Sequence, residues 1–466
     1  MKLFEALGNM FRIPDLRKRV FFMLGLLAVY RLGSFVPTPG IDVIRWNDFL
    51  SQQAGSIFGL FDLFAGGNIR RLSVFALGIM PYITASIILQ LLTVVVPTLE
   101  KLQKEGELGR RKITQWTRYL TVGLGIAQSF GIAVGLQQMQ DNIVIHPGIG
   151  FTAMTILSLT TGTAFIMWLG EQITERGIGN GMSLIIFTGI VVGLPNAIQN
   201  IYTNVFITHE WNFFELLLIL VMMVAVVGFI VLVEMGERRI PVQYAKRVIG
   251  RRVMGGQSTH MPLKVNAGGV IPVIFASSIL AFPQTIATTP FVKNSAWLSG
   301  LLASIRYSEP LYILLFVALI IFFCFFYVSI IFNPNEAADN MRKYGGFIPG
   351  IRPGRSTSDY MNTILTRITF VGAIYLSILC LIPSIMISGI HLQHLPLVGG
   401  FIDAHFPRFI LEGLNVSFYF GGTSLLIVVG VAMDTINQIE AQLIMRHYEG
   451  FTPRAGRIRG RRSSSV

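Results

Sequence analysis

Long runs of apolar residues, separated by short polar stretches, occupy most of the chain between residues 20 and 436. A helix needs roughly 20 mostly apolar residues to cross the hydrocarbon core of a bilayer. Ten runs meet this length, at 20–38, 72–96, 113–137, 150–170, 182–202, 212–235, 268–289, 311–332, 368–389 and 414–436. The pattern therefore predicts an all-α polytopic membrane protein with ten transmembrane helices.

Three stretches differ from this pattern. In the N-terminal segment 1–19, the apolar residues of 3–11 recur at helical spacing, which predicts an amphipathic helix on the membrane surface. Residues 57–67 are apolar but only about half as long as a span, so they form either a re-entrant segment or a helix on the outer leaflet. The basic tail, 437–466, is expected to be mostly solvated.

Positive charge is distributed unevenly between the two sets of loops. The loops on the same side as the termini hold 29 lysines and arginines, whereas the opposite loops hold 6. Cytoplasmic loops of membrane proteins carry such an excess. We therefore expect both termini to lie in the cytoplasm, and we attribute the net charge of +13 to these loops rather than to binding of nucleic acid.

The composition agrees with a membrane protein and excludes other classes. Apolar residues make up 52% of the 466 residues and charged residues only 13%, against roughly 25% charged residues in an average soluble domain. The mean hydropathy is +0.62. These values exclude a disordered chain and disfavour a soluble enzyme, because so few charges cannot cover a surface of this size.

The number of spans permits a symmetric architecture. The first five and the last five predicted spans enter the membrane from opposite sides, because five is odd. Such parity allows an inverted repeat of an N-terminal half, 20–202, and a C-terminal half, 203–436, with a functional path between them. The sequence shows no convincing internal repeat, so parity alone leaves this arrangement open.

Motifs typical of catalysis and metal binding are missing from the sequence. It contains neither a GxxxxGK[ST] phosphate-binding loop nor an HExxH zinc motif. His391 and His394 form an HxxH pair without acid or thiol partners, and Cys324 and Cys380 lie in apolar runs as expected buried free thiols. We therefore expect no enzyme activity, no catalytic residue, no metal site and no cofactor.

Few charged residues fall inside the predicted spans. The acids there are Glu215, Glu234 and Asp434, all near span ends. Ion-coupled transporters usually carry a carboxylate at mid-membrane, so a coupled small-solute transporter is disfavoured, though still an alternative. Arg31 and Arg118 are expected to snorkel toward the membrane surface or to pair with another group.

Two long loops on the side of the termini differ from plain connectors. Loop 236–267 carries seven lysines and arginines against one acid, and Ile240, Val242 and Tyr244 alternate with other residues, which predicts a projecting hairpin. Its charge suits a phosphate-rich partner or is ordinary positive-inside charge, so a membrane-anchored RNA-binding or scaffold protein is a further alternative. Gly-Pro turns in loop 333–367 predict a rigid surface feature.

Seven long motifs are recognisable between residues 75 and 434. They are FALGIMPYITASIILQLLT at 75–93, ITERGIGNG at 173–181, RRIPVQYAKR at 238–247, IPVIFASSIL at 271–280, FNPNEAADN at 332–340, GFIPGIRPG at 346–354 and FGGTSLLIVVGVAMD at 420–434. In these motifs the chain resembles the bacterial SecY family, the channel subunits of the general protein-translocation machinery. The resemblance extends from the first span through residue 436 and leaves the tail after about 446 unmatched.

The resemblance implies two inverted five-helix halves around a central hourglass pore. Unfolded secretory polypeptides would cross this pore, and transmembrane segments would leave it laterally between the second and third spans and the seventh and eighth. A waist ring of aliphatic side chains would seal it, formed by Ile79, Ile83, Ile186, Ile190, Ile274 and Ile427. Residues 57–67 would be a plug outside the ring, with Phe58, Leu60, Phe61, Leu63, Phe64, Gly66 and Gly67.

The resemblance also implies the partners of the chain. An external motor, the SecA ATPase or the translating ribosome with its RNA, would dock on Arg239, Arg251, Arg252 and Arg352 of the two long loops. SecE and SecG subunits would complete a complex in the cytoplasmic membrane. Its clients would be preprotein signal sequences and nascent membrane proteins, and membrane lipid would surround it.

Overall fold

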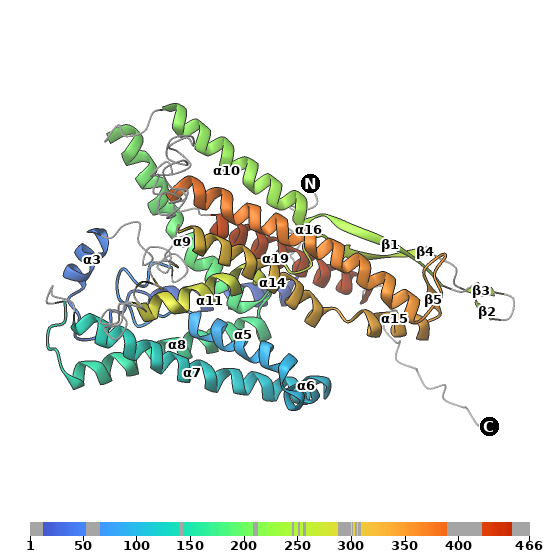
Figure 1. Cartoon of the computed structure of the whole chain (residues 1–466), viewed down its shortest axis with the longest axis horizontal. Coiled ribbons are helices and arrows are strands. Elements are labelled where there is room, and N and C mark those ends of the chain that lie inside the picture. Colours follow the sequence, from blue (N-terminus) through green and yellow to red (C-terminus); the bar gives the residue numbers. More distant parts are fainter. Residues whose placement is uncertain are drawn as a thin grey trace, which may run out of the picture.

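The computed structural model describes residues 13–52, 66–138, 143–207, 213–244, 247–249, 252–254, 258–287, 300, 302, 305, 309–388 and 422–449. Its helices run mostly along one axis, and the strands project from one end (Figure 1). Each of the ten predicted spans contains a helix: α2 (Pro14–Gly33), α5 (Met80–Val95), α7 (Glu107–Gln137), α8 (Ile149–Arg176), α9 (Gly181–Tyr202), α10 (Phe213–Glu234), α11 (Ile271–Ala287), α14 (Pro310–Ile331), α16 (Arg355–Ser388) and α19 (Gly422–Glu449).

Several of these helices are long and apolar enough to cross a membrane. Within the described residues, six pass on length and composition, in α7, α8, α9, α14, α16 and α19. The bent pair of α5 and α6 (Pro97–Lys104) passes when taken together, with an angle of 99° between the two. Shorter apolar helices cover Leu220–Glu234 and Ile271–Leu280. The structure therefore agrees with a polytopic membrane protein.

The helices extend beyond the apolar runs, which changes the two terminal segments. α2 begins at Pro14 rather than at residue 20, and α19 continues to Glu449. The first part of the segment predicted as a mostly solvated tail is therefore helical, and Ile439 within it packs with Leu16 of α2 in a buried cluster. Residues 1–12 and 450–466 lie outside the described residues.

Short elements occur between the long helices. The π-helical turn η1 (Thr203–Ile207) extends α9, and α15 (Pro334–Lys343) lies in the second long loop. Helix α3 (Val43–Gln52) follows α2 and was not predicted from the apolar pattern. The Asp42 carboxylate begins α3 by accepting a hydrogen bond from the amide of Ile44 at 3.0 Å.

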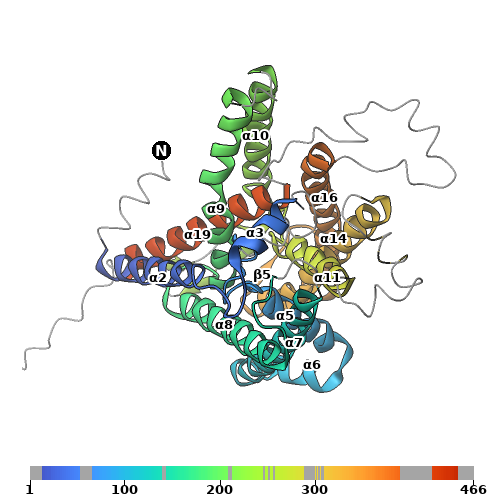
Figure 2. The ribbon, with the colours of Figure 1, turned by 90° about the vertical axis from the view of Figure 1, so that its left-hand side faces the viewer.

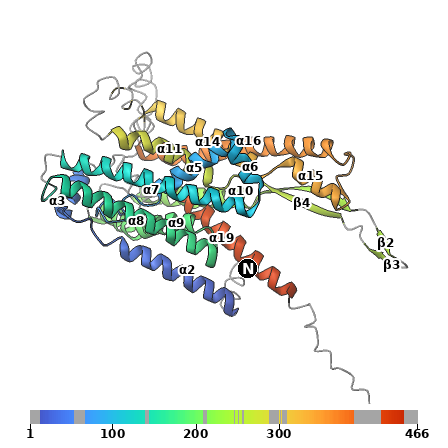
Figure 3. The same ribbon diagram turned by 90° about the horizontal axis from the view of Figure 1, so that it is seen from below.

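The predicted projecting hairpin is confirmed. β1 (Glu237–Tyr244) pairs antiparallel with β4 (Ser258–Lys264), and β2 (Arg247–Ile249) pairs with β3 (Arg252–Met254) at the far tip (Figures 1 and 3). The other edge of β1 pairs with β5 (Gly346–Phe347) from the second long loop, giving the order β4-β1-β5. This pairing joins the two long loops into one surface feature, which the sequence did not reveal.

The helices form two groups that meet along two seams. α2, α5, α7, α8 and α9 pack together, as do α10, α11, α14, α16 and α19. α11 contacts α5 and α7 at one seam, and α9 contacts α19 at the other. Figure 2 looks along the bundle and shows α2, α7 and α8 on one side and α10, α14 and α16 on the other. The largest buried apolar cluster contains residues of both groups.

Candidate functional site

The six isoleucines of the predicted ring come from four parts of the fold. Ile79 directly precedes α5 and Ile83 lies in its first turns, while Ile186 and Ile190 lie on α9. Ile274 lies on α11 and Ile427 on α19, so both groups of helices contribute. Residues four apart share one face of a helix, which explains the two pairs on α5 and α9.

All six isoleucines are buried in the same apolar cluster. Their exposure ranges from 0% at Ile427 to 7% at Ile83. Neighbours in this cluster include Phe275 and Phe323, whose rings meet edge to face at 5.6 Å. The structure thus places the six residues in one packed region where the two groups of helices meet, and their role as a seal stays a prediction.

An open cavity of about 420 Å³ adjoins this region. Ile83, Ile186 and Ile274 contribute to its apolar wall, together with side chains of α11 and α14. Its polar lining, called the polar wall below, comes from α5, α7, α8 and the start of α9, through Ser86, Gln90, Thr114, Arg118, Glu171, Thr174, Glu175, Asn180 and Ser183. Helices from both sides of the α5–α11 seam therefore line one amphipathic cavity.

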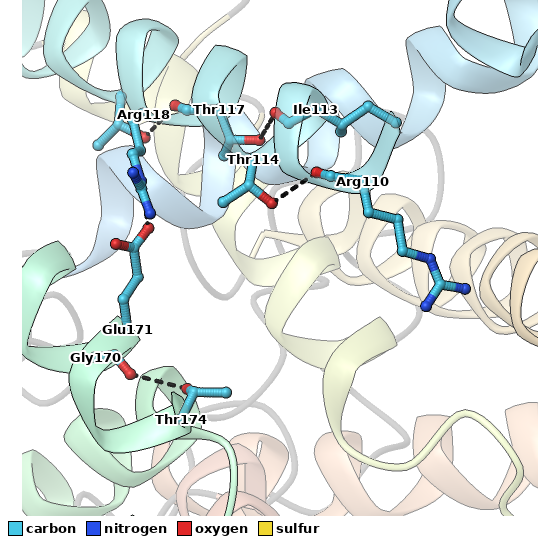
Figure 4. Close-up of polar contacts among 9 residues, drawn as sticks. Arg110, Ile113, Thr114, Thr117, Arg118, Gly170, Glu171 and Thr174 are labelled. Carbon is cyan, nitrogen blue, oxygen red and sulfur yellow. Dashed lines mark hydrogen bonds and ion pairs between the residues drawn. The ribbon is translucent and has the colours of Figure 1, made fainter. Parts of the chain in front are cut away.

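The polar wall contains an ion pair between adjacent helices. Arg118 Nε of α7 donates to Glu171 Oε1 of α8 at 2.8 Å (Figure 4). Nearby hydroxyls of Thr114 and Thr174 donate to the carbonyls of Arg110 and Gly170, four residues earlier in their own helices. The expectation that Arg118 pairs is confirmed, and these threonines satisfy their hydroxyls locally.

Reversing the charge at either end of this pair is expected to destabilise the protein. Arg118→Glu and Glu171→Arg should each lower the thermal unfolding midpoint of the purified protein by the equivalent of about 1 kcal/mol, because like charges then face each other at a half-exposed site. The double variant should regain most of this loss. The same exchange at Glu100 and Lys104, an exposed pair on α6 at 2.6 Å, is the control and should have little effect. A double variant no better than the single ones would contradict the pairing.

At the second seam, polar contacts fix α19 against the start of α9. The amide of Gly179 donates to Gln438 Oε1 of α19 at 3.0 Å. Gly430 of α19 lies so close to Val270 that an added Cβ would come within 2.3 Å of a valine methyl group. This close approach places the helix that carries Ile427 directly beside the segment leading into α11.

The plug residues are only partly within the described structure. Phe58, Leu60, Phe61, Leu63 and Phe64 lie outside the described residues. Gly66 and Gly67 have φ angles of +71° and +80°, a region that favours glycine. A Cβ at Gly66 would lie 2.7 Å from the Cα of Gly189 on α9. Gly66 therefore packs against α9 at Gly189, next to Ile190 of the predicted ring.

The arginines predicted to dock a motor fall on the joined loops. Arg239 on β1 is exposed, and its Nε lies 2.6 Å from Oε1 of Glu237, a partner that the sequence analysis did not foresee. Arg352 is exposed in the turn before α16, and no hydrogen bond or ion pair of its guanidinium occurs among the described residues. Arg251 lies outside the described residues, and Arg252 lies on β3.

Glu234 and Asp434, two of the three acids near span ends, have local partners. Glu234 is buried and accepts a hydrogen bond from Asn266 Nδ2 at 3.1 Å. Asp434 lies 3.8 Å from Lys264 Nζ. Cys324 and Cys380 are buried and form no disulfide, as predicted. In the part of the chain that the structure describes, no group of three or more His, Cys, Asp or Glu could hold a metal ion.

Sequence reasoning missed the polar wall of the cavity. Its members come from four separate stretches of the chain, and although Thr114 and Arg118 share one helix face and Glu171 and Glu175 another, the sequence does not show that these faces meet. The one residue of this wall that the sequence analysis singled out was Arg118. It is a cation inside an apolar run, and it was expected to snorkel or to pair. Fold and site together define a polytopic helical membrane protein in which a polar cavity ends at a closely packed apolar region between two groups of helices.

The chain belongs to the SecY family, whose model matches residues 73–436. It is 50% identical over 447 residues to protein translocase subunit SecY of Escherichia coli (strain K12), covering 95% of each chain. It is 46% identical over 463 residues to protein translocase subunit SecY of Streptomyces coelicolor, covering 96% of this chain and all of the relative. SecY is a channel subunit of the translocase and not an enzyme, so this chain is not a catalytic subunit.

Solved structures share the fold. A structure of a protein-conducting channel matches 96% of this chain and 99% of its own, with a TM-score of 0.60 at 15% identity. Sec61 in the canine ribosome-channel complex from the endoplasmic reticulum matches with a TM-score of 0.54 at 14% identity. The all-α polytopic architecture is therefore that of the SecY and Sec61 channels.

Proposed function

We propose that this chain is the pore-forming subunit of a protein translocase in the cytoplasmic membrane, with both termini in the cytoplasm. It passes unfolded secretory polypeptides across the membrane and releases transmembrane segments laterally into lipid. The observation that carries this proposal is the burial of six isoleucines from both groups of helices in one cluster beside an amphipathic cavity. Membership of the SecY family supports it.

The isoleucine ring suits a seal for a polypeptide channel. Narrow apolar constrictions exclude water and ions by dewetting, without binding the solute that passes. Aliphatic side chains present no charge or hydrogen-bonding group that would hold one polypeptide sequence more strongly than another. The six come from four separate parts of the fold, so movement of those parts can widen the ring around chains of different size and close it behind them.

The seam between α5 and α11 is the proposed lateral exit. Across this seam a Ser278 hydroxyl lies 4.0 Å from the Met80 sulfur, which is a weak polar contact. On the α11 side, Phe275 packs edge to face on Tyr327 of α14, so α11 and α14 can move as one unit. Parting this seam would join the amphipathic cavity to lipid, which is the route an apolar signal sequence or transmembrane segment needs.

The energy comes from outside the chain, since the sequence lacks a nucleotide-binding loop. We propose that the SecA ATPase and the ribosome dock on the three-stranded sheet and the adjoining turn that carries Arg352. Structures of Sec61 in a ribosome-channel complex and of yeast Ssh1 bound to the 80S ribosome share the fold and support a ribosomal partner. SecE and SecG subunits would complete the complex.

Cysteine crosslinking tests the ring directly. In a chain lacking Cys324 and Cys380, single cysteines at the six ring positions should crosslink to a translocating polypeptide arrested in the channel. Leu220 and Val224 of α10, both exposed, are matched controls that should face lipid and give little product. Equal crosslinking at ring and control positions would remove the ring assignment.

Reconstitution tests the function itself. Proteoliposomes with the purified complex, SecA, ATP and a preprotein should protect the preprotein from added protease. A coupled small-solute transporter or an RNA-binding scaffold would give no protected preprotein. Failure of protection with an active SecA would therefore contradict the proposed function, whatever the ring residues do.

A further inference from the structure

The segment from Gly66 to Ile79 leads to the first ring residue, Ile79, without forming an α-helix. It consists of turns, and Asn68, Leu72 and Ser73 within it are fully or almost fully buried. Irregular backbone inside a membrane protein is tolerated only where other protein groups satisfy its polar atoms. Because this segment ends at Ile79, whatever fixes its position also fixes one member of the isoleucine ring.

Two adjacent residues of α2 contact the beginning of this segment. Nη1 of Arg31 donates to the carbonyl of Gly66 at 3.2 Å. Nδ2 of Asn68 donates to the hydroxyl of Tyr30 at 3.2 Å, and both of these side chains are buried. A hydrogen bond from a charged donor is stronger than one between neutral groups, so the Arg31 contact is the stronger of the two.

The opposite side of Gly66 touches the ring helix α9. Its hypothetical Cβ would lie 2.7 Å from the Cα of Gly189, which directly precedes Ile190. Gly66 is therefore held between the Arg31 guanidinium and the backbone of α9. A shift of Gly66 away from Arg31 would change the spacing between α9 and the segment that carries Ile79.

Further along, the segment is fixed to the chain after α2 by other contacts. The Thr38 amide donates to the carbonyl of Leu72 and the Val74 amide to that of Val36, both at 2.9 Å. Trp46 Nε1 donates to the carbonyl of Ile69 at 2.7 Å. These contacts do not depend on Arg31, so removing the Arg31 side chain should loosen the end near α9 without unfolding the segment.

We infer that Arg31, assisted by Tyr30, is a positioning residue for the isoleucine ring. It holds Gly66 against Gly189, which keeps the start of this segment packed on α9 next to Ile190 while the channel is closed. The inference rests on the proposed function, because it assigns Arg31 to the seal that the ring forms. Arg31, a charged residue within an apolar run, would thus help to keep the resting channel closed.

Arg31 has two other contacts that an experiment must separate from this role. It lies in the last turn of α2, where a cation is favourable to the helix dipole, and its guanidinium lies 4.9 Å from the Phe35 ring. Arg71 lies over the same ring at 4.3 Å. Arg71 is therefore a matched control that shares the charge and the Phe35 contact and has no recorded bond to Gly66.

The test measures the resting ion conductance of the reconstituted complex in planar bilayers. Arg31→Gln should raise it several-fold, Arg31→Lys should raise it less because a charged donor remains, and Arg71→Gln should leave it unchanged. Gly66→Ala should also raise it, because the added Cβ meets α9 and the φ of +71° is strained for alanine. Thermal unfolding midpoints of the same samples check that the variants are folded.

Ile186→Ala serves as the reference for the ring itself. If Ile186→Ala leaks and Arg31→Gln does not, the inference fails while the proposed ring stands. If neither leaks, the seal at the ring fails and the inference with it. Equal leakage from Arg31→Gln and Arg71→Gln would also overturn the inference, because loss of charge alone would then explain it.

A conservative variant covers the case in which Arg31→Gln does not assemble. Tyr30→Phe removes only the hydroxyl that accepts from Asn68 and leaves the ring of residue 30 stacked on Phe75. It should raise the resting conductance by a smaller factor with an unchanged unfolding midpoint. Unchanged conductance in Tyr30→Phe, with Arg31→Gln unfolded, would overturn the role of this pair in positioning the ring.

Discussion

Replacing Arg352 with glutamate is expected to stop SecA-driven translocation while leaving membrane insertion and SecE assembly intact. Arg352 is exposed, and its turn is held on both sides by Gly350 and Gly354, with φ angles of +82° and +109°. The Thr357 hydroxyl donates to the Arg352 carbonyl at 2.9 Å, which ties the turn to the start of α16. A fixed backbone therefore presents one long cationic side chain outward.

The size of this effect follows from the chemistry of guanidinium. Its planar fork binds a carboxylate or phosphate through two parallel hydrogen bonds. Losing a charge-assisted contact costs on the order of 2 kcal/mol, and placing glutamate against an acidic partner adds repulsion. We expect SecA-dependent translocation in proteoliposomes to fall at least about tenfold, because each ~1.4 kcal/mol corresponds to a factor of ten.

Two companion variants make the result specific. Arg352→Lys should recover only part of the activity, since lysine keeps the charge but not the fork. Arg355→Glu changes charge equally, three residues along the same loop at the first residue of α16, and should retain most of the activity. Full SecA-driven translocation by Arg352→Glu at normal expression would show that this arginine does not dock the motor. Resting ion conductance should not change in any of the three.

Deleting residues 57–67 is the second change with a large expected effect. If this apolar segment rests outside the isoleucine ring, its loss removes one of two barriers, and ions should leak through the resting channel. Preproteins with defective signal sequences should also be accepted, because less energy is then needed to open the channel. Planar-bilayer conductance and proteoliposome translocation measure the two effects.

The described contacts of Gly66 allow a sharper design. A deletion of 57–65 keeps Gly66 against Arg31 and α9, whereas a deletion of 57–67 removes this contact as well. We expect the longer deletion to leak more. Replacing 57–65 by a Gly-Ser linker of equal length controls for loop length and should leak like the shorter deletion. Unchanged conductance in all three would argue against a plug in this segment.

Apolar periodicity and charge determined the membrane architecture from the sequence. Each of the ten predicted spans holds a helix, and the alternation of Ile240 and Val242 correctly predicted a hairpin, in which both side chains are buried. These features depend on local sequence, because helix length and strand alternation are set by whether neighbouring residues are apolar. The motifs shared with SecY proteins identified the family. They also implied the ring residues and the docking arginines, which stay predictions.

Helix ends and short helices were harder to predict from the sequence. The apolar run of the last span ends near 436, whereas α19 continues to Glu449, since its extension packs against the start of α2. Helix α3 was overlooked because its pattern is short and its anchor, Trp46, bonds to Ile69 in a distant part of the chain. In both cases a long-range contact stabilises a helix that local hydrophobicity does not mark.

Only the tertiary structure decided which distant residues meet. The pairing of β1 with β5, the ion pair of Arg118 with Glu171 and the bond from Arg31 to Gly66 join residues 35 or more positions apart. Sequence identifies Arg31 and Arg118 as charges that lipid cannot solvate, which either snorkel to the membrane surface or pair with another group. It cannot choose the partners, because that choice depends on how the helices pack. Packing follows from the combined shape of many side chains rather than from any local pattern.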